Sequence, residues 1–265
     1  MSSLLSHNYA LKREVQRLTT GDEDFRSQFV SWNLADLSYI DIQNYLKVKD
    51  VVLVPMASTE QHGPHLPLYT DTITAIEVST RVSEAIAVLH TPPIWAGYSP
   101  QHMYAPGQGR GTITLRSSTL LALMSDVARS LIHHGFNRIV FINGHGSNVK
   151  VVDPILRKLR YETGALIGFV RPYMERYVGV LEGLMENPPE ETPGWHASEL
   201  ETSQDLACNP ELVRMERATH QGAHSRLSAQ IILKKRWHAR CRIRRIPVLH
   251  LSDGSSRVHR KWNHR

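Results

Sequence analysis

Residues 51–71 read VVLVPMASTEQHGPHLPLYTD, a continuous apolar run that leads directly into a group of acids and histidines. The apolar part, residues 51–58, predicts a strand buried on both faces, as strands inside parallel sheets are. Polar residues that follow such a strand lie at its carboxyl end, where open parallel sheets bind ligands. This one stretch therefore predicts both the type of sheet and the edge at which a functional site would form.

Strands and helices alternate along the chain. Apolar runs predict two more buried strands, at residues 137–144 and 165–170, and short strands near residues 92–97 and 112–115. The spacing of apolar residues predicts helices at residues 72–89, 117–135, 149–164 (interrupted near Pro154) and 196–208. This alternation predicts an α/β fold, a single layered domain with a largely parallel sheet flanked by helices.

The composition is that of an ordinary globular protein, with 41% hydrophobic and 21% charged residues. No apolar run approaches the roughly 18 residues needed to cross a bilayer, so no membrane association is expected. The two cysteines, Cys208 and Cys241, are far apart and belong to no CxxC pattern. A reducing, cytoplasmic location is therefore the expectation.

The net charge of +6 comes from the end of the chain. Residues 226–265 contain twelve Lys/Arg and one acid, a local charge of 12 − 1 = +11, so residues 1–225 carry 6 − 11 = −5. This contrast predicts a loosely ordered basic tail at 226–265 after a folded domain at 31–225, and the polar character of residues 1–30 predicts an N-terminal extension. The tail also raises the alternative of a nucleic-acid-binding protein, but the acidic body and the lack of a recognisable nucleic-acid-binding motif argue against it.

Three groups of polar residues stand out. Two of them follow predicted strands, at residues 60–71 and 143–148, and the third opens the predicted helix at residues 196–208. Because the carboxyl ends of parallel strands share one edge of a sheet, the first two groups are expected to meet. Together the three groups supply Glu60, His62, Asp71, His145, His196, Glu199 and Glu201.

Carboxylates and imidazoles together suit zinc, manganese or iron. A carboxylate such as Asp71 can bridge two ions about 3.5–4 Å apart, and the pair lowers the pKa of a shared water to near neutral. The pattern therefore predicts a site for two divalent metal ions per chain. A single histidine after a strand is more often an ordinary loop residue, so the prediction depends on all three groups. His102, in the Pro- and Gly-containing loop at 99–111, is either a pocket-lining or an ordinary loop residue.

In these groups the sequence resembles the creatininase (creatinine amidohydrolase) family. The matching stretches are PMASTEQHGPHLPLYTD (55–71), SPQHM (99–103), NGHGSN (143–148) and HASELETS (196–203). The resemblance implies a binuclear metal-dependent amidohydrolase with a single α/β domain, which forms a cyclic homo-oligomer, often a hexamer. It also implies that a metal-bridging hydroxide hydrolyses a C–N bond in a small polar amide or cyclic amide.

The resemblance places Glu60, His62, Asp71 and His145 at metal-ligand positions, with Asp71 as the bridge. Creatininase carries a glutamate two residues after the histidine of its NGH block, whereas this chain has Ser147 there. Glu199 is the expected substitute for that missing ligand.

His196 and Glu201 are the expected catalytic residues. His196 would pass a proton to the leaving group, and Glu201 would be an acid that supports the site. Ser147 argues against creatinine as the substrate. The family also includes formamide deformylases, a peptidase of a redox-cofactor pathway and hydrolases of oxidised inositols, so a cyclic ketone is the alternative substrate class.

The basic tail is a second departure from the family. Relatives usually close with Gly-rich, acid-containing segments, whereas residues 226–265 are rich in Arg, His, Trp and Ser. We hypothesise that this segment is out of frame relative to the ancestral gene, and that residues after about 225 add little to the core.

Overall fold

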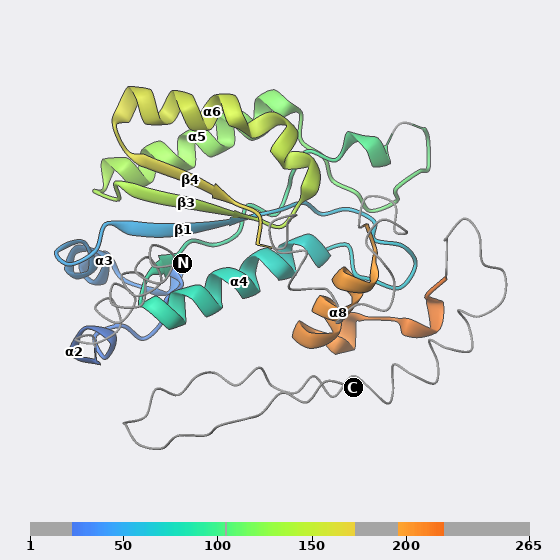
Figure 1. The fold of residues 1–265 in the computed structure, drawn as a ribbon, viewed down its shortest axis with the longest axis horizontal. Coiled ribbons are helices and arrows are strands. Elements are labelled where there is room, and N and C mark those ends of the chain that lie inside the picture. Colours follow the sequence, from blue (N-terminus) through green and yellow to red (C-terminus); the bar gives the residue numbers. More distant parts are fainter. Residues whose placement is uncertain (1–22, 104, 173–195, 220–265) are drawn as a thin grey trace, which may run out of the picture. The chain divides into compact units, whose positions relative to one another are not determined.

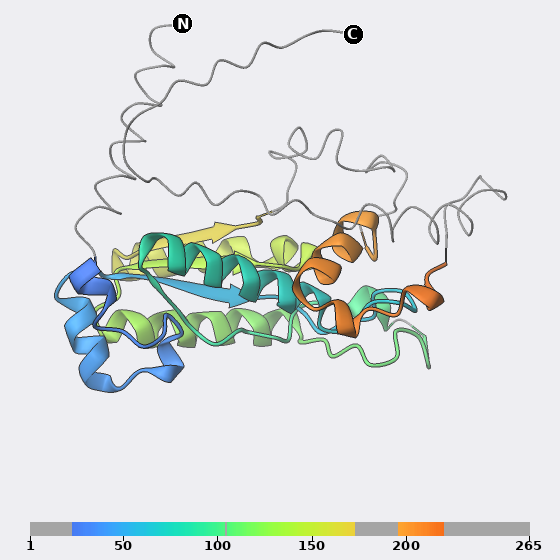
Figure 2. The same cartoon turned by 90° about the horizontal axis from the view of Figure 1, so that it is seen from below.

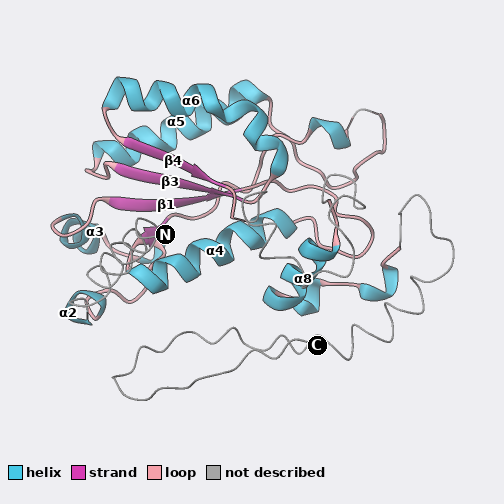
Figure 3. Ribbon diagram, viewed as in Figure 1, coloured by secondary structure: helices cyan, strands magenta, loops and turns pink. Residues whose placement is uncertain are grey.

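One parallel sheet lies at the centre of the protein. The structure is a computed structural model that describes residues 23–103, 105–172 and 196–219. Its strands are β1 (Val51–Met56), β2 (Leu89–His90), β3 (Arg138–Asn143) and β4 (Leu166–Val170). They pair in the order β2-β1-β3-β4, and every pair is parallel (Figure 1, Figure 3). The predicted α/β fold with a parallel sheet is therefore confirmed.

Helices cover both faces of this sheet. Helices α5 (Ser117–His133) and α6 (Val149–Thr163) lie on one face, and α4 (Thr70–Ile86) lies on the other (Figure 1). Helix α8 (Glu199–Cys208) packs beside the start of α4, as Figure 2 also shows. The remaining helices are α2 (Glu23–Arg26), α3 (Tyr39–Leu46) and the 3-10 turns η1 (Leu34–Asp36), η2 (Pro100–His102), η3 (Gly146–Asn148), η7 (Pro210–Leu212) and η8 (Met215–Arg217).

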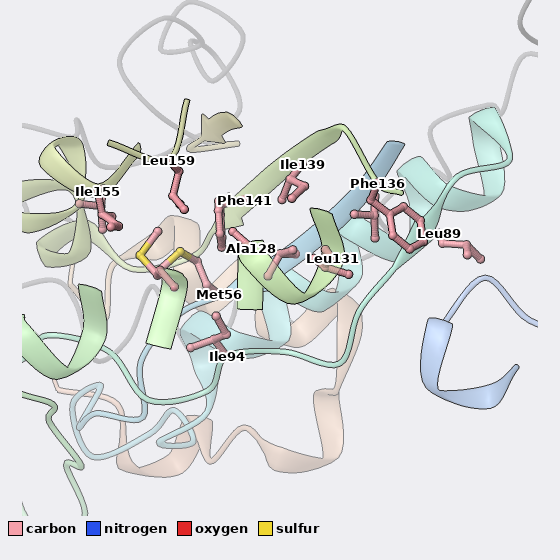
Figure 4. Packing of buried hydrophobic residues seen from close by; sticks show 14 of the residues in the cluster. Met56, Leu89, Ile94, Ala128, Leu131, Phe136, Ile139, Phe141, Ile155 and Leu159 are labelled. Atoms are coloured by element: carbon pink, nitrogen blue, oxygen red, sulfur yellow. The ribbon is translucent and has the colours of Figure 1, made fainter. Parts of the chain in front are cut away.

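Alternation along β1 divides the core between the two faces. Val52, Val54 and Met56 join the larger apolar cluster, to which α5 and α6 contribute (Figure 4). Leu53 points to the opposite face and packs with Ile142 in a smaller cluster that α4 covers. Each fully buried aliphatic side chain contributes about 1.5–3 kcal/mol, so the two clusters hold the sheet between its helices.

The folded core begins earlier in the chain than residue 31. Phe25 is buried in the larger cluster, and its ring packs against those of Trp32 and Tyr45. The guanidinium of Arg26 donates to the carbonyls of Glu84 and Ala85 at the end of α4, at 2.6 and 3.0 Å. The segment predicted as an N-terminal extension thus contributes at least residues 25–30 to the domain.

Two short-strand predictions are wrong. Near residues 92–97 only isolated bridges form, from Ile94 to Met56 and from Gly97 to Thr114. Pro92 and Pro93 lack N–H donors and interrupt a ladder there. Near residues 112–115 only single bridges occur as well. The strand β2 forms instead at Leu89–His90, at the predicted end of a helix.

The predicted helix at 72–89 ends at Ile86 because Ala87 takes a left-handed conformation, with φ of 52°. Strand β4 is only partly buried, since Leu166 and Val170 are exposed at the sheet edge. Helix α6 runs through Pro154 without a break. The Pro-rich loop at 187–194 and the tail at 226–265 lie outside the described residues. Within the described ranges, no helix has the length and apolar character that a membrane crossing requires.

Candidate metal centre

Five acid and imidazole side chains converge at the carboxyl ends of β1 and β3. Glu60 and His62 lie in the loop after β1, Asp71 is the second residue of α4, and His145 follows β3. Glu201 reaches the same place from the first turn of α8. We call these residues, Glu60, His62, Asp71, His145 and Glu201, the acid–histidine cluster.

Close backbone packing brings β3 to the start of α4. A Cβ added to Gly144 would lie only 2.0 Å from the carbonyl oxygen of Asp71, so only glycine permits this approach. Gly146, on the other side of His145, has open space around it. Of the two glycines beside His145, only Gly144 is therefore required by a close approach of the backbone.

The Asn148 side chain ties the surrounding loops together. Its Nδ2 donates to the carbonyl of Ala57 at 3.1 Å and to Oδ1 of Asn143 at 3.0 Å, and its Oδ1 accepts from the N–H of Tyr98 at 2.9 Å. Asn148 is fully buried. Three loops that follow different parts of the sheet are thus fixed by one amide.

Backbone carbonyls orient both cluster histidines. Nδ1 of His62 donates to the carbonyl of Glu60 at 3.0 Å, which leaves Nε2 facing the carboxylates. Nε2 of His145 lies 3.1 Å from the carbonyl of Tyr98 and 3.1 Å from Oγ of Ser99, which leaves Nδ1 facing the carboxylates. A carbonyl on one ring nitrogen and a free lone pair on the other is the usual arrangement of a metal-ligating histidine.

Asp71 presents one carboxylate oxygen to each histidine. Its Oδ1 lies 3.2 Å from Nε2 of His62, and its Oδ2 lies 2.8 Å from Nδ1 of His145. Oε1 of Glu60 is 3.4 Å from Nδ1 of His145. Oε2 of Glu201 is 3.8 Å from Nε2 of His62. Oε1 of Glu60 is also 4.0 Å from Nε2 of His62, and Glu60, His62 and Asp71 form one group of possible metal donors. Asp71 faces both histidines with separate oxygens, which is the arrangement expected of a bridging carboxylate.

Glu201, and not Glu199, reaches the cluster. Among the described residues, Glu201 belongs to a group of possible metal donors with His62 and His196, whereas Glu199 belongs to no such group. Oε2 of Glu201 also accepts from the N–H of Ala197 at 2.5 Å, just before the helix N-cap Ser198. The expectation that Glu199 supplies the last ligand is therefore unsupported by the geometry.

The cluster is strongly charged and buried. Burial alone would lower the pKa of His62 and of His145, but the neighbouring carboxylates outweigh it and raise each pKa to about 10. Burial raises the pKa of Glu201 to about 8, while the two histidines hold the pKa of Asp71 well below its usual range despite burial. In the absence of a cation, protons on the imidazoles balance the acids. A divalent cation can replace those protons.

Two buried oxygens test whether a cation fits. Oε2 of Glu60 and Oδ2 of Asp71 have no hydrogen-bond partner among the described residues. Oδ2 of Asp71 is close to His145 but lacks hydrogen-bond geometry, as expected when both atoms face a third centre. Buried acceptors without donors cost about 1–3 kcal/mol each, more when charged. These two oxygens, together with the imidazole nitrogens and the other carboxylate oxygens of the cluster, fit divalent zinc, manganese or iron.

His196 and His102 lie on one side of this cluster. The His196 ring is 4.3 Å from that of His62 and 4.7 Å from that of His102, centroid to centroid. Nδ1 of His196 and Nε2 of His102 each lie 3.5 Å from a different oxygen of Glu60. Burial lowers the pKa of His196 to about 4, helped by His62, so this ring is neutral near pH 7.

The sequence does not predict a role in this site for three of its residues. For His102 it leaves two interpretations, a pocket-lining residue or an ordinary loop residue, and it indicates no role for Gln61 or Asn148. Gln61 joins His102 to His196, with Nε2 at 3.1 and 2.9 Å from their ring nitrogens. Its position between Glu60 and His62 was the only available signal.

Comparison with known proteins identifies related hydrolases. The family model described as creatinine amidohydrolase matches residues 35–245, which extends past the predicted domain end at residue 225. The chain is 33% identical over 175 residues to creatinine amidohydrolase of Pseudomonas putida, covering 63% of this chain and 67% of that protein. It is 29% identical over 179 residues to 3-dehydro-scyllo-inosose hydrolase of Thermotoga maritima, covering 66% and 55%.

A third relative is more similar over a shorter stretch. Mycofactocin precursor peptide peptidase of Mycolicibacterium smegmatis is 41% identical over 118 residues, covering 42% of this chain and 46% of that protein. The chain therefore spans about half the length of two of these three relatives.

Solved structures of the family have the same fold. A manganese form of creatininase superposes with a TM-score of 0.61 at 30% identity, covering 75% of this chain and 81% of that one. A Zn-Zn type creatininase variant superposes with a TM-score of 0.61 at 26% identity, covering 76% and 81%. These relatives are therefore metal proteins with the same fold, and their metals are zinc and manganese.

Proposed function

The chain belongs to the creatininase family of hydrolases, and from this premise we propose that it is a metal-dependent amidohydrolase with two divalent ions per chain. The observation that carries the proposal is Asp71, whose two oxygens face His62 and His145 separately. Asp71 is buried, so any cation that its two oxygens bind must lie inside the acid–histidine cluster.

The donors divide naturally between the two proposed ions. Glu60, Asp71 and His145 would hold one ion, and His62, Asp71 and Glu201 would hold the other. When bound, such a pair activates water near neutral pH and polarises a carbonyl oxygen. Glu201 replaces Glu199 in this assignment because α8 directs Glu201 toward His62.

The residues of this chain would position and protonate the substrate. His196 lies beside the cluster, is neutral near pH 7 and carries a ring nitrogen 3.5 Å from Oε1 of Glu60. We assign to it the transfer of a proton toward the leaving nitrogen, in which the neutral ring takes up one proton from water for each proton that it releases, a role worth about 10²–10⁴-fold in rate for a well-placed acid or base. Glu201 then acts as a ligand and not as an independent acid.

The proposed substrate class is a small polar amide or cyclic amide, with a cyclic ketone as the alternative. The named relatives act on creatinine, on 3-dehydro-scyllo-inosose and on a mycofactocin precursor peptide, so the family supports C–N hydrolysis and ring opening alike. Ser147 stands at the rim, where its Oγ accepts from Nε2 of Gln101 at 3.0 Å. A neutral hydroxyl there argues against creatinine itself.

The test combines metal analysis with a substrate screen. Purified protein is expected to contain about two zinc, manganese or iron ions per chain, and chelation is expected to abolish hydrolysis. The screen covers small amides, lactams and cyclic ketones, with each hit repeated after chelation and metal return. Protein without these metals, or hydrolysis that survives the chelator, would contradict the proposal.

A variant separates catalysis from metal binding. His196→Ala is expected to lower turnover by about 10²-fold or more while the metal content stays unchanged. Loss of metal in this variant would instead identify His196 as a ligand.

Assembly and location complete the proposal. By family resemblance we expect a cytoplasmic homo-oligomer, a hexamer in the simplest case. Light scattering of the purified protein measures the number of chains.

A further inference from the structure

Gln61 lies where two histidines meet the acid–histidine cluster. Its backbone N–H donates to Oγ1 of Thr112 at 3.1 Å, which anchors the residue between Glu60 and His62. Its side-chain amide lies between His102 and His196, far from both in sequence. The residue itself is half-buried.

One contact fixes which way the Gln61 amide points. Oε1 lies 3.1 Å from the backbone N–H of Gly63, a group that can only donate. The oxygen must therefore be on that side, because an amide nitrogen cannot accept a hydrogen bond. This leaves Nε2, which can only donate, facing Nδ1 of His102 at 3.1 Å and Nε2 of His196 at 2.9 Å.

The protonation of both rings follows from that donor. A neutral imidazole has one nitrogen that donates and one that accepts. Since Nδ1 of His102 and Nε2 of His196 both accept from Gln61, the proton of each ring lies on the other nitrogen. Those nitrogens, Nε2 of His102 and Nδ1 of His196, are the ones 3.5 Å from the two oxygens of Glu60.

We propose that Gln61 is a positioning residue that sets the tautomers of His196 and His102, so that both ring N–H groups point at Glu60. This inference rests on the proposed function for its catalytic consequence: neutral His196 holds its N–H on the side of the cluster, where it donates a hydrogen bond, and it can release that proton to the leaving nitrogen only as Nε2 gains one from water. The tautomers themselves follow from the contacts alone.

The proposal also bears on one further group of possible metal donors. Glu60, His102 and His196 present donor atoms within 4.8 Å of one another and thus resemble a third metal group. When Gln61 donates to Nδ1 of His102 and Nε2 of His196, the ring nitrogens that face Glu60 carry protons. A protonated nitrogen cannot bind a metal ion. Gln61 therefore keeps the N–H groups of these two histidines on the side of Glu60, 3.5 Å from its oxygens.

Ring-nitrogen spectra test the proposal directly. Zinc-loaded protein carrying ¹⁵N in its histidine rings is studied by solid-state NMR, which does not depend on oligomer size. A nitrogen with a proton and one without are well separated in chemical shift, and His102→Gln and His196→Gln identify the signals. The expected result is a proton on Nδ1 of His196 and on Nε2 of His102. The opposite tautomer, or a mixture, in either ring of the unaltered protein would overturn the proposal.

Substitution of Gln61 inverts the prediction. In Gln61→Glu the side chain can only accept toward the two rings, so the ring nitrogens that face residue 61 are expected to become protonated, by reversal of the tautomer or by full protonation of the ring. Gln61→Met removes the preference and gives mixtures. Gln101→Glu is the matched control: it adds the same charge on the same side of the sheet but contacts Ser147 instead, and is expected to leave both tautomers unchanged. Unchanged tautomers in Gln61→Glu would overturn the proposal.

Kinetics separate this inference from the proposed function. In Gln61→Glu we expect kcat to fall by about 10²-fold or more, the usual contribution of a positioned acid or base, with metal content and KM little changed. Reversed tautomers with unchanged kcat would overturn the catalytic role of the tautomer. A protein that hydrolyses nothing but shows the expected tautomers would contradict the proposed function and leave Gln61 as the residue that sets them.

Discussion

Buried side chains lie at both ends of the central strands, but they differ in kind. At the amino ends, Tyr45 and Phe136 pack at 6.0 Å between ring centroids, and the Tyr45 hydroxyl donates to the carbonyl of Val51 at 2.7 Å. At the carboxyl ends, Glu60, His62 and Asp71 are between 0 and 3% exposed. One end buries aromatic rings with a satisfied hydroxyl, and the other buries charges.

The difference shows which end of the sheet stabilises the fold and which end weakens it. Apolar burial is favourable by itself. A buried set of charges is costly unless partners match it, and two carboxylate oxygens of the acid–histidine cluster have no donor among the described residues. We therefore expect variants at the aromatic end to change stability and variants at the polar end to change metal binding and activity.

The largest effect is expected for Asp71→Asn, because both proposed ions share this carboxylate. Loss of the two metal ions removes several kcal/mol of transition-state stabilisation, which corresponds to a fall of at least about 10³-fold in kcat/KM. Metal content is measured by elemental analysis and should fall toward zero. The melting temperature of the metal-free variant should also fall below that of the metal-free parent, since Asp71 balances the protonated His62 and His145 there. A variant that keeps both ions would contradict the expectation that the polar end of the sheet controls metal binding.

Phe136→Ala is expected to have the opposite profile. Truncating a fully buried phenylalanine costs about 3–5 kcal/mol of unfolding free energy. Denaturant unfolding measures this loss, while metal content and kcat per folded molecule should stay unchanged. Loss of metal in this variant, under conditions where it is folded, would show that the two ends are coupled.

Two substitutions on α8 test which of its glutamates binds metal. Glu201→Gln is expected to weaken binding of the ion near His62 by more than the roughly 10–100-fold seen when a residue that only supports a ligand is lost. Glu199→Gln, two residues away on the same helix, should change binding by far less. Metal titration of both variants measures the difference, and a larger effect at Glu199 would restore the original expectation.

The smallest effect concerns pH in the metal-free protein. His62 and His145 have pKa values raised from 6.5 to about 10, so the stability from their charged forms is fully present below pH 6.5 and is lost as pH rises through about 10. The pKa of Glu201, raised from 4.5 to about 8, acts in the same direction. Thermal melts from pH 6.5 to 10 should show declining stability without metal and little decline with it. The same decline of melting temperature with pH in the presence and absence of metal would contradict the idea that a cation replaces the protons on His62 and His145.

Apolar runs were sufficient to predict β1, β3 and β4, and the same-edge rule for parallel strands brought Glu60, His62, Asp71 and His145 together correctly. The choice between Glu199 and Glu201 was beyond that reasoning. Residues two apart on a helix point about 200° away from each other, so the answer depends on how α8 is rotated against the rest of the domain. That rotation is fixed by contacts distant in sequence, such as Thr70 Oγ1 donating to Asp205 at 2.6 Å and His65 beside Thr202 at 2.9 Å.

His102 and Gln61 were hidden for a related reason. Their roles depend on a loop at 99–111 with no regular period, whose path is set by buried contacts such as Ser99 with Ser58 at 2.5 Å. Neither residue type marks a function by itself, since a glutamine amide matters here only through the orientation that Gly63 imposes. Side-chain networks of this kind become visible only when the loops are placed in space.

The position of Glu201 at the start of α8 has a consequence for the order in which the protein is made. Four of the five cluster donors lie before residue 146, and the fifth is synthesised only with α8. Because a domain folds as a unit, the acid–histidine cluster is complete only after α8 has left the ribosome and docked. We therefore expect stable capture of both ions to follow the docking of α8, which makes a late step of folding also the step that completes the enzyme.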